Sequence, residues 1–321
     1  MLSLTWVMAM YNSEVKERFL SEYASKGSNV KNIRYRFDNI GNFEQFISKD
    51  MAQMSKNEAI SALNQLEFLE MSSAEGFLSV TKTYIRWCKD YEVFDDIAEG
   101  FLQVSLTDID PSLSMSKMFF RDERDFLYSM RKVREFDELQ NDVIALIFAW
   151  LGLSLDEALD IRDNDVDFEA RKIYNRNGTT VVSWISDEFI EILYQYQRMK
   201  SAIRQNGTTT YEVVKDLSHD GFIKRVCSVN SDKLGTKIPP RQLVSAINKM
   251  NKKYVELGFA PRFSVQNAQR CGRLHRLWVM EQSGFMVDDK RNANTVEEVC
   301  GSKQYRKILW QYKHYKRAFN L

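Results

Sequence analysis

Apolar residues recur at helical spacing through much of this chain. Two such stripes lie in the first hundred residues: Tyr35, Phe37, Ile40, Phe43, Phe46 and Ile47, then Phe77, Val80, Tyr84 and Trp87. A period of three to four residues predicts amphipathic helices that pack through one face. The segments Ser55-Lys-Asn-Glu58 and Ser72-Ser-Ala-Glu75 each place a hydroxyl three residues before a carboxylate, the pattern of a capping box at a helix start. We therefore expect residues 1–98 to form a small helical domain.

The pattern weakens over residues 99–118, which we interpret as a linker, and resumes in a second domain over 119–321. In that domain apolar spacing and capping signals predict a series of helices, which cover 121–133, 139–151, a segment starting at Ser154, 187–204, 241–257, 265–283 and 303–319. Two β-rich runs between 172 and 185 flank Asn177-Gly178, a strong hairpin signal, and 211–217 could be a further strand. The expected fold class is mainly α with a small β-hairpin or sheet.

Composition supports this class and excludes others. Only 4 Pro and 13 Gly among 321 residues argue against a turn-rich all-β protein. The longest apolar run, 143–153, falls short of the roughly 20 residues that cross a bilayer, and no signal-peptide pattern opens the chain, so we expect a cytoplasmic protein without a membrane partner. Four scattered cysteines and three histidines are too few and too dispersed for a zinc site, so we expect reduced, buried thiols, no metal and no cofactor.

Charge is segregated although the net charge is only +1. Residues 137–169 hold ten acidic residues and one basic residue, whereas 222–276 hold twelve basic and two acidic residues. A stretch this basic can bind phosphates, because each cation near a phosphate releases condensed counterions. The alternative is a solvated face that the acidic stretch neutralises within the fold.

Within the basic stretch, Arg270, Arg273 and Arg276 are spaced by three, which places them near one helical face. Three neighbouring arginines repel one another, so we favour phosphate as their ligand over simple solvation. The candidate nucleic-acid-binding residues are the cations of both domains: Lys31, Arg34, Arg36, Lys82, Arg86, Lys224, Arg225, Lys237, Arg241, Lys249, Arg270, Arg273 and Arg276. The helical faces that carry Lys82 with Arg86 and Arg241 with Gln242 are candidates for reading the major groove.

Three short stretches resemble the tyrosine recombinase (phage integrase) family. The segment 144–168, with Gly152-Leu-Ser-Leu-Asp-Glu157, is similar to the family's apolar helix and its Thr-Gly-Leu-Arg-x-x-Glu turn; 270–284 is similar to the His-x-x-Arg box; and Tyr312-Lys-His314 is similar to the terminal Tyr-x-His. The resemblance implies a helical core-binding (SAM-like) DNA-binding domain, followed by a mixed α/β catalytic-like domain. Together they would hold double-stranded DNA.

The departures from the family pattern concern its chemistry. Family enzymes attack a phosphate with tyrosine, and arginines, a His or Trp and a hairpin lysine assist. Here Ser154 replaces the first arginine, Arg270 the box histidine and Ser302 the later His/Trp, and Arg176 is the basic residue nearest the hairpin turn. Glu157, Arg273 and a displaced Tyr312 remain as vestiges. Since one lost charge-stabilising donor typically costs about 10² to 10³ in rate, we expect no strand cleavage and no catalytic residues.

Each vestige also has a plain structural explanation. Glu157 could be only the acidic member of a capping box, and Tyr312 lies on an apolar stripe that favours a packing role. His275, His314 and His219 lack informative partners at any spacing, and we interpret them as structural.

Taken together, these patterns predict a sequence-specific protein that binds operator sites in double-stranded DNA, a recombinase-derived transcriptional repressor of phage type. One alternative is an active recombinase with Tyr312 or Tyr315 as nucleophile and Arg176 or Lys172 assisting. Another is a protein-interaction module that does not bind DNA. The last helix could mediate self-association by passing to a second copy, or it could pack within its own chain.

Overall fold

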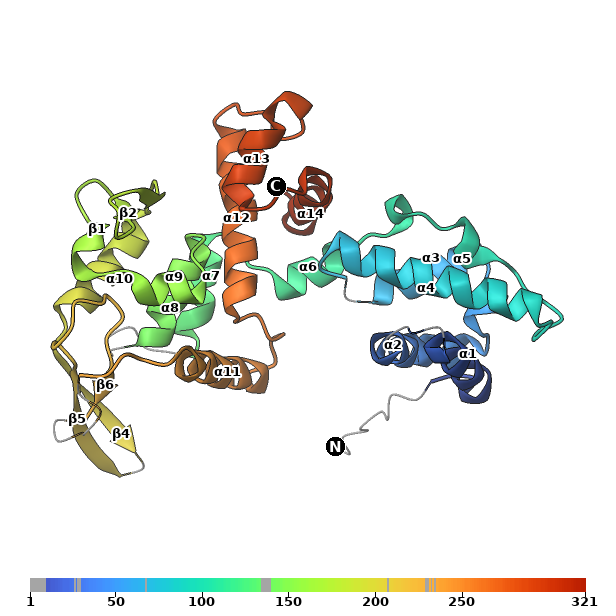
Figure 1. The fold of residues 1–321 in the computed structure, drawn as a ribbon, viewed down its shortest axis with the longest axis horizontal. Helices are drawn as coiled ribbons and strands as arrows, with labels where there is room; N and C mark the ends of the chain where they lie inside the picture. Colours follow the sequence, from blue (N-terminus) through green and yellow to red (C-terminus); the bar gives the residue numbers. More distant parts are fainter. Residues whose placement is uncertain are drawn as a thin grey trace. The chain divides into compact units, whose positions relative to one another are not determined.

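The computed structural model describes the chain except for residues 1–9, 26, 28, 29, 67, 134–139, 207, 229, 230, 232 and 234. The described chain forms two compact units, which we treat separately. Unit 1 comprises residues up to 115 together with Arg306–Leu321, and unit 2 comprises Ser116–Tyr305. The expected fold class, mainly α with small antiparallel sheets, is confirmed (Figure 1).

Unit 1 is helical. Its helices and 3-10 turns are α1 (Ser13–Ser25), α2 (Lys31–Ile47), η1 (Met51–Gln53), α3 (Lys56–Gln65), α4 (Met71–Asp90), α5 (Gly100–Gln103), η2 (Leu106–Asp108), the start of α6 (Ser112–Met118) and most of α14 (Tyr305–Phe319). Ser55 caps α3 through the expected capping box with Glu58. The second box is wrong, because α4 already begins at Met71 and Ser72 lies inside its first turn.

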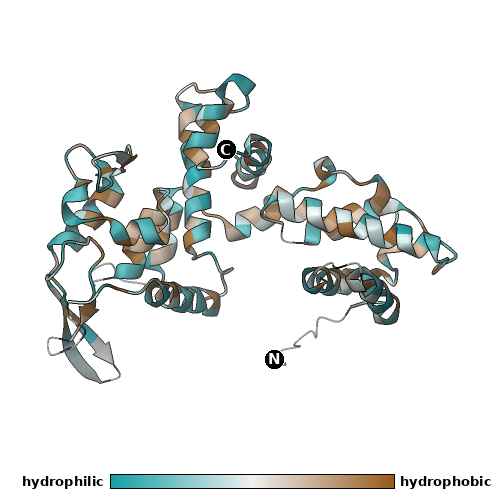
Figure 2. Ribbon diagram, viewed as in Figure 1, coloured by the Kyte–Doolittle hydropathy of each residue, from teal (hydrophilic) through white to brown (hydrophobic). Residues whose placement is uncertain are grey.

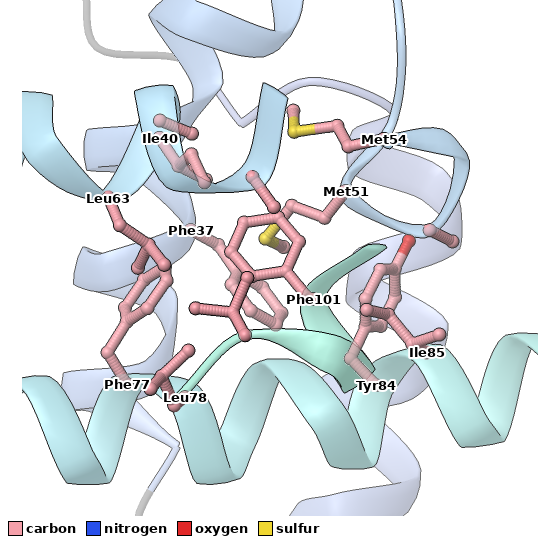
Figure 3. Packing of buried hydrophobic residues seen from close by; sticks show 14 of the residues in the cluster. Phe37, Ile40, Met51, Met54, Leu63, Phe77, Leu78, Tyr84, Ile85 and Phe101 are labelled. Carbon is pink, nitrogen blue, oxygen red and sulfur yellow. The ribbon is translucent and has the colours of Figure 1, made fainter. Parts of the chain in front are cut away.

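The core of unit 1 takes Phe37, Ile40 and Phe43 from the first predicted stripe and Phe77, Tyr84 and Trp87 from the second. Tyr35 and Phe46 of the first stripe are exposed, so the prediction of a packed face is wrong for these two residues. Phe37 of α2 and Tyr84 of α4 face each other with ring centroids 5.3 Å apart (Figure 3). Phe101, Val104 and Ile109 are also buried in this core. Residues 99–115 therefore belong to the helical unit. Most of their few apolar residues, though not periodic, pack in its core, whereas Leu113 is exposed.

A buried polar cluster lies inside this core. Lys16 of α1 forms ion pairs with Glu44 at 2.5 Å and with Asp50 at 3.7 Å, and all three side chains are fully buried. The hydroxyl of Tyr84 donates to Asp50 at 3.1 Å. Burial raises the pKa of Glu44 to about 7, against the attraction of Lys16.

Unit 2 combines helices with two small sheets. Its helices are α7 (Glu123–Arg131), α8 (Asn141–Trp150), α9 (Leu155–Asp160), α10 (Asp187–Arg198), α11 (Pro240–Glu256), α12 (Val265–Gln282) and α13 (Ala293–Cys300), with 3-10 turns η3 (Asp163–Asp165) and η4 (Lys290–Asn292). The predicted helix 139–151 is observed from Asn141; residue 139 lies outside the described residues. Sequence reasoning missed α13.

The first sheet is antiparallel, with strands β1 (Val166–Asp167), β2 (Lys172–Tyr174) and β3 (Thr180–Val182) in that order. The predicted hairpin is thus present, and Gly178 at its turn has φ +75°, which glycine adopts without strain.

The second sheet, β4 (Ser201–Asn206), β5 (Thr209–Lys215) and β6 (Val226–Cys227), is also antiparallel (Figure 1). The suggested strand over 211–217 is present as β5. The predicted helix 187–204 is too long, because α10 ends at Arg198 and the chain reverses into β4, where Ile203 pairs with Glu212. Strand pairing within the hairpin that β4 forms with β5 overrides the local helical pattern there.

None of the helices in the described residues is long and apolar enough to span a membrane. The four cysteines are unpaired thiols, and Cys88, Cys271 and Cys300 are buried. Burial raises the pKa of the Cys271 thiol to about 12.

Candidate nucleic-acid interface

Helix α11 presents the most basic exposed face in the described part of unit 2. Leu243, Ile247, Met250 and Tyr254 are buried on one side. The opposite side exposes cations and hydrogen-bonding residues, namely Arg241, Gln242, Ser245, Asn248, Lys249, Lys252 and Lys253. Glu256 at its end is the only acidic residue in the helix. Teal and brown residues alternate along α11 in Figure 2, as this two-sided pattern requires.

The cations of α11 are available to a ligand. Arg241, Lys249, Lys252 and Lys253 form no ion pair with any residue that the structure describes. Four unneutralised cations along one helix produce a local positive potential that favours phosphate. Sequence reasoning did not single out four further residues of this face, Ser245, Asn248, Lys252 and Lys253. Their spacing was a usable signal, because they continue the helical face that begins at Arg241.

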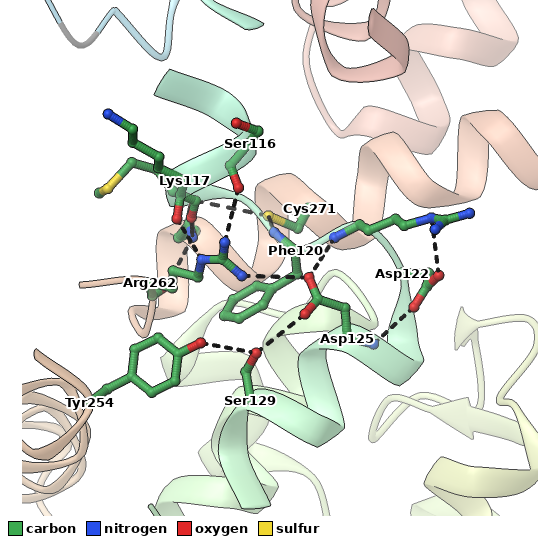
Figure 4. A network of polar contacts seen from close by, with 12 residues as sticks. Ser116, Lys117, Phe120, Asp122, Asp125, Ser129, Tyr254, Arg262 and Cys271 are labelled. Carbon is green, nitrogen blue, oxygen red and sulfur yellow. Dashed lines mark hydrogen bonds and ion pairs between the residues drawn. The ribbon is translucent and has the colours of Figure 1, made fainter. Parts of the chain in front are cut away.

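A polar network fixes α11 beside α7 and the start of α12 (Figure 4). The hydroxyl of Tyr254 donates to Ser129 at 3.2 Å, and Ser129 donates to Asp125 at 3.3 Å. Arg262, in the loop between α11 and α12, forms an ion pair with Asp125 at 3.5 Å and donates to the Ser116 carbonyl at 2.9 Å. The network holds the basic helix on a rigid support.

Helix α12 packs so closely on α8 that only glycine fits at the contact. A Cβ at Gly272 would lie 1.9 Å from the backbone oxygen of Trp150. Gln269 of α12 also donates to the Leu153 carbonyl at 2.8 Å. The segment resembling the His-x-x-Arg box and the segment resembling the glycine turn are therefore brought together, as the resemblance implies.

The three arginines of α12 do not act as one group. Each step of three residues offsets the side chain by about 60° around the helix, so Arg270 and Arg276 lie about 120° apart and contact different neighbours. Arg276 donates to the Leu151 carbonyl at 2.6 Å, and its guanidinium lies against Gly152, where φ is +107°. Burial lowers the pKa of Arg276, and the nearby charge of Arg273 lowers it further. Arg276 thus ties α12 to the residue that follows α8, and its binding of phosphate stays a prediction.

Arg270 and Arg273 lie elsewhere on α12. The Arg270 guanidinium stacks over the Phe119 ring, 5.7 Å from its centroid. Arg273 is half-buried beside α13, with its guanidinium 3.4 Å from the position a Gly301 Cβ would take. Ser302, the residue at the family's His/Trp position, follows Gly301 in the sequence. Arg273 therefore lies near this position. Burial raises the pKa of the nearby Cys300 thiol to about 11, and the charges of Arg273 and Arg276 act against this rise.

Ser154 and Glu157 have a structural role. Ser154 caps α9 by accepting from the Glu157 backbone at 3.2 Å, and the Glu157 carboxylate accepts from the Ser154 backbone at 2.7 Å. This is the reciprocal capping box that the sequence allowed as the plain explanation. Arg176 of the hairpin is held by Asp160 at 3.0 Å.

Tyr312 is a packing residue in this structure. It lies on α14 in unit 1 and is 3% exposed, with the Lys316 ammonium 4.9 Å from its ring centroid. His314 on the same helix is buried beside Asp110, and burial lowers its pKa. His275 stacks on Trp278 and lies tilted against Trp150. His219 accepts from the backbone of Gly221 at 3.2 Å.

Two of the proposed phosphate ligands are buried, which corrects the prediction for them. Lys224 is 3% exposed and pairs with Asp163, and Arg225 is 9% exposed and donates to the carbonyls of Thr236 and Lys237. Lys237 is exposed but lies 3.8 Å from Asp160. Acidic residues of 137–169 therefore neutralise part of the basic stretch, as the alternative explanation held, whereas α11 keeps its charge.

The cations of unit 1 also differ in environment. Arg34 forms a two-pronged ion pair with Glu17, and Lys82 donates to the Val104 carbonyl at 2.8 Å, so both are partly satisfied within the fold. Lys31 and Arg86 are exposed. Arg36 is half-buried in a cleft that is described below.

Comparisons with known proteins found one family model that matches part of the chain and several similar solved structures. Residues 10–90 match the family described as MrpR, N-terminal core-binding domain. Among solved structures, the chain is similar to XerA recombinase (11% identity, 96% of this chain and 97% of that one, TM-score 0.40) and to an integrase from mycobacterium phage Brujita (11%, 95% and 92%, 0.37). It is also similar to the Tn1549 transposon integrase in complex with a circular intermediate DNA (12%, 95% and 95%, 0.38).

No curated protein matches the chain. The structural neighbours found are thus tyrosine recombinases and integrases, and the N-terminal quarter of the chain matches a core-binding domain.

Proposed function

We propose that this chain is a sequence-specific double-stranded DNA-binding protein, derived from a recombinase, that represses transcription without cleaving DNA. In this it would be similar to the SPβ prophage master repressor. The observation that carries the proposal is the exposed face of α11, where four cations, which have no acidic partner among the described residues, alternate with Gln242, Ser245 and Asn248. The core-binding match of residues 10–90 supports it.

Helix α11 contains both kinds of group that a DNA-reading helix needs. Lysine and arginine position a helix on the phosphates, while amide side chains bond base edges in the major groove. We assign Lys249, Lys252 and Lys253 to phosphates and Gln242 and Asn248 to bases, with Arg241 able to do either. Lys31 and Arg86 would extend the phosphate contacts from unit 1.

Two features support the absence of strand cleavage. Ser154, which stands where the family has an arginine, is engaged in capping α9. Tyr312 is packed into unit 1 with 3% of its surface exposed. A tyrosine that acts as nucleophile must be accessible to the phosphate that it attacks, and Tyr312 is buried.

The binding test is selection of bound duplexes from a random pool, followed by titration of the selected site over a range of salt. A protein that contacts six or more phosphates loses about 10³ or more in affinity between 50 and 200 mM salt. We expect Lys249→Gln and Lys252→Gln to weaken selected and random duplexes alike, and Gln242→Ala and Asn248→Ala to weaken the selected site by about 1–3 kcal/mol while sparing random DNA. We expect Arg273→Ala to weaken all duplexes alike, and unchanged affinity would remove Arg273 from the interface.

Lys237→Gln is the matched control, because Lys237 lies in the same stretch but beside Asp160. A protein whose binding is independent of salt and of the α11 lysines would instead be a protein-interaction module.

Cleavage is tested separately with nicked duplexes that trap a covalent protein–DNA adduct. We expect none. An adduct that forms in the wild type and is lost in Tyr312→Phe would identify an active recombinase and overturn the repressor assignment.

A further inference from the structure

Unit 1 contains a cleft that the proposed function does not use. It has a volume of about 630 Å³ and lies between α2, the end of α3 and α4. Aromatic side chains line it (Tyr35, Phe68 and Phe77), together with Asn39, Ser73 and Arg36. No acidic residue is among the described residues that line it. Cavities of about 300–1,000 Å³ with apolar walls and a few convergent polar groups are typical of small-molecule sites.

Arg36 gives the cleft its charge. Its side chain is half-buried, and it forms no ion pair with any residue in the described part of the chain. A guanidinium has five N–H donors and no acceptor, so removing it from water without an anionic partner costs free energy. Among the described residues the guanidinium therefore has no anion, and one that binds in the cleft would pair with it.

Gly76 makes room for this guanidinium. It lies in the interior of α4, where glycine costs about 1 kcal/mol relative to alanine. A Cβ at Gly76 would lie 3.0 Å from Nη1 and 3.3 Å from Nη2 of Arg36. A side chain here would push the guanidinium out of its position.

We propose that this cleft binds a small organic anion in which a carboxylate or phosphate is attached to a flat ring. The planar fork of Arg36 matches the two oxygens of either anion, Asn39 and Ser73 supply further hydrogen bonds, and the aromatic walls accept the ring. Such a ligand would be an effector bound to unit 1.

The test uses phenyl phosphate as the anionic probe and benzyl alcohol as its neutral counterpart, added to the full chain labelled with ¹⁵N-arginine. We expect a saturable shift of the Arg36 Nε–Hε resonance with phenyl phosphate and none with benzyl alcohol. In Arg36→Gln the thermal stabilisation that phenyl phosphate gives the wild type is lost. Arg86→Gln, which removes an exposed arginine of the same unit, keeps it.

Gly76→Ala is the second variant, because it leaves every charge in place. It adds a good helix former to α4, so the free energy of unfolding is unchanged or rises, while the displaced guanidinium weakens phenyl phosphate binding at least tenfold. If Arg36 had only a structural role, Gly76→Ala would not weaken phenyl phosphate binding while leaving the free energy of unfolding unchanged or higher.

Two results overturn the proposal. One is the absence of any saturable shift in the wild type. The other is phenyl phosphate binding that survives both Arg36→Gln and Gly76→Ala. If no probe binds and Arg36→Gln instead lowers the salt dependence of DNA binding, the anion is a DNA phosphate. The probe experiment contains no DNA, so its failure is distinct from failure of the proposed DNA binding.

Discussion

At the scale of single residues, side chains of the same type have opposite roles according to their surroundings. Arg276 and Arg273 are three positions apart on α12, yet one is bonded to a backbone carbonyl of α8 and the other faces the end of α13. Gly272 and Gly76 both lie inside helices, but a side chain would meet a rigid backbone at the first and a flexible arginine at the second. Residue type alone does not distinguish these cases.

Gly272→Ala should therefore destabilise unit 2 severely. The added methyl would overlap the Trp150 carbonyl, so α8 and α12 must separate, at a cost of about 3 kcal/mol or more. Urea denaturation followed by circular dichroism measures the loss. Gly76→Ala is the control, and equal stability changes in the two variants would contradict the close helix contact.

The buried cluster around Glu44 should make unit 1 sensitive to pH. Because the pKa of Glu44 is raised to about 7 in the folded state, this carboxyl keeps a proton that the unfolded chain has lost above its ordinary value of 4.5. The free energy of unfolding should then fall as pH rises through this window, by at most about 3 kcal/mol from this group.

Glu44→Gln tests this dependence. The variant has no carboxyl to titrate there, and Asp50 still provides Lys16 with an anionic partner. We expect the difference in unfolding free energy between wild type and variant to change between pH 5 and pH 7.5. Parallel stability curves over this range would refute the raised pKa.

At the scale of elements, short-range signals place helix starts correctly where a cap is formed and wrongly where it is not. The boxes at Ser55 and Ser154 are both made, whereas the similar pattern at Ser72 is not, because α4 begins one residue earlier. The end of α10 shows that a helical sequence pattern can also continue beyond the observed helix. Its helical pattern continues to residue 204, but pairing of β4 with β5 ends the helix at Arg198.

These caps give matched substitutions. Ser55→Ala and Ser154→Ala should each lower the free energy of unfolding by about 1 kcal/mol, since each leaves a helix N–H without its acceptor. Ser72→Ala, inside the first turn of α4, should change it by a few tenths at most. Thermal and urea denaturation measure the free energy of unfolding of the three variants. A loss in Ser72→Ala as large as in the other two would show that the predicted capping box at Ser72 is formed.

At the scale of the whole molecule, the first unit is completed by the end of the chain. Gln311 donates to the Leu69 carbonyl at 2.7 Å, and Arg317 pairs with Asp110 at 2.9 Å. The predicted domain limits, 1–98 and 119–321, differ from these two units. A single boundary along the sequence assigns the last helix to the second domain, whereas the structure packs it in unit 1.

Deleting residues 306–321 should therefore destabilise unit 1. The deletion removes the buried side chains of Ile308, Tyr312 and Tyr315, and burying one such side chain contributes about 1.5–3 kcal/mol. Hydrogen exchange of the full-length and shortened chains measures the effect, which we expect as lost protection in α4. Unchanged protection of α4 would show that α14 contributes nothing to this unit.

Self-association through α14 is tested on the same helix. Exchange between two copies would make the contacts with Leu69 and Asp110 between chains, and sedimentation velocity with and without DNA would then detect a dimer. Monomers under both conditions would leave α14 packed in its own chain.

The sequence by itself determined most of the longer helices, much of their apolar faces, the Asn177-Gly178 hairpin and the fold class. These depend on spacing and capping, which act over a few residues. Only the tertiary structure decided which cations are free, because ion pairs join distant positions: Lys224 and Asp163 are 61 residues apart. It also decided that Ser154 and Glu157 are occupied with each other, that Arg276 supports a helix contact, and that the charge of α11 is left for a ligand.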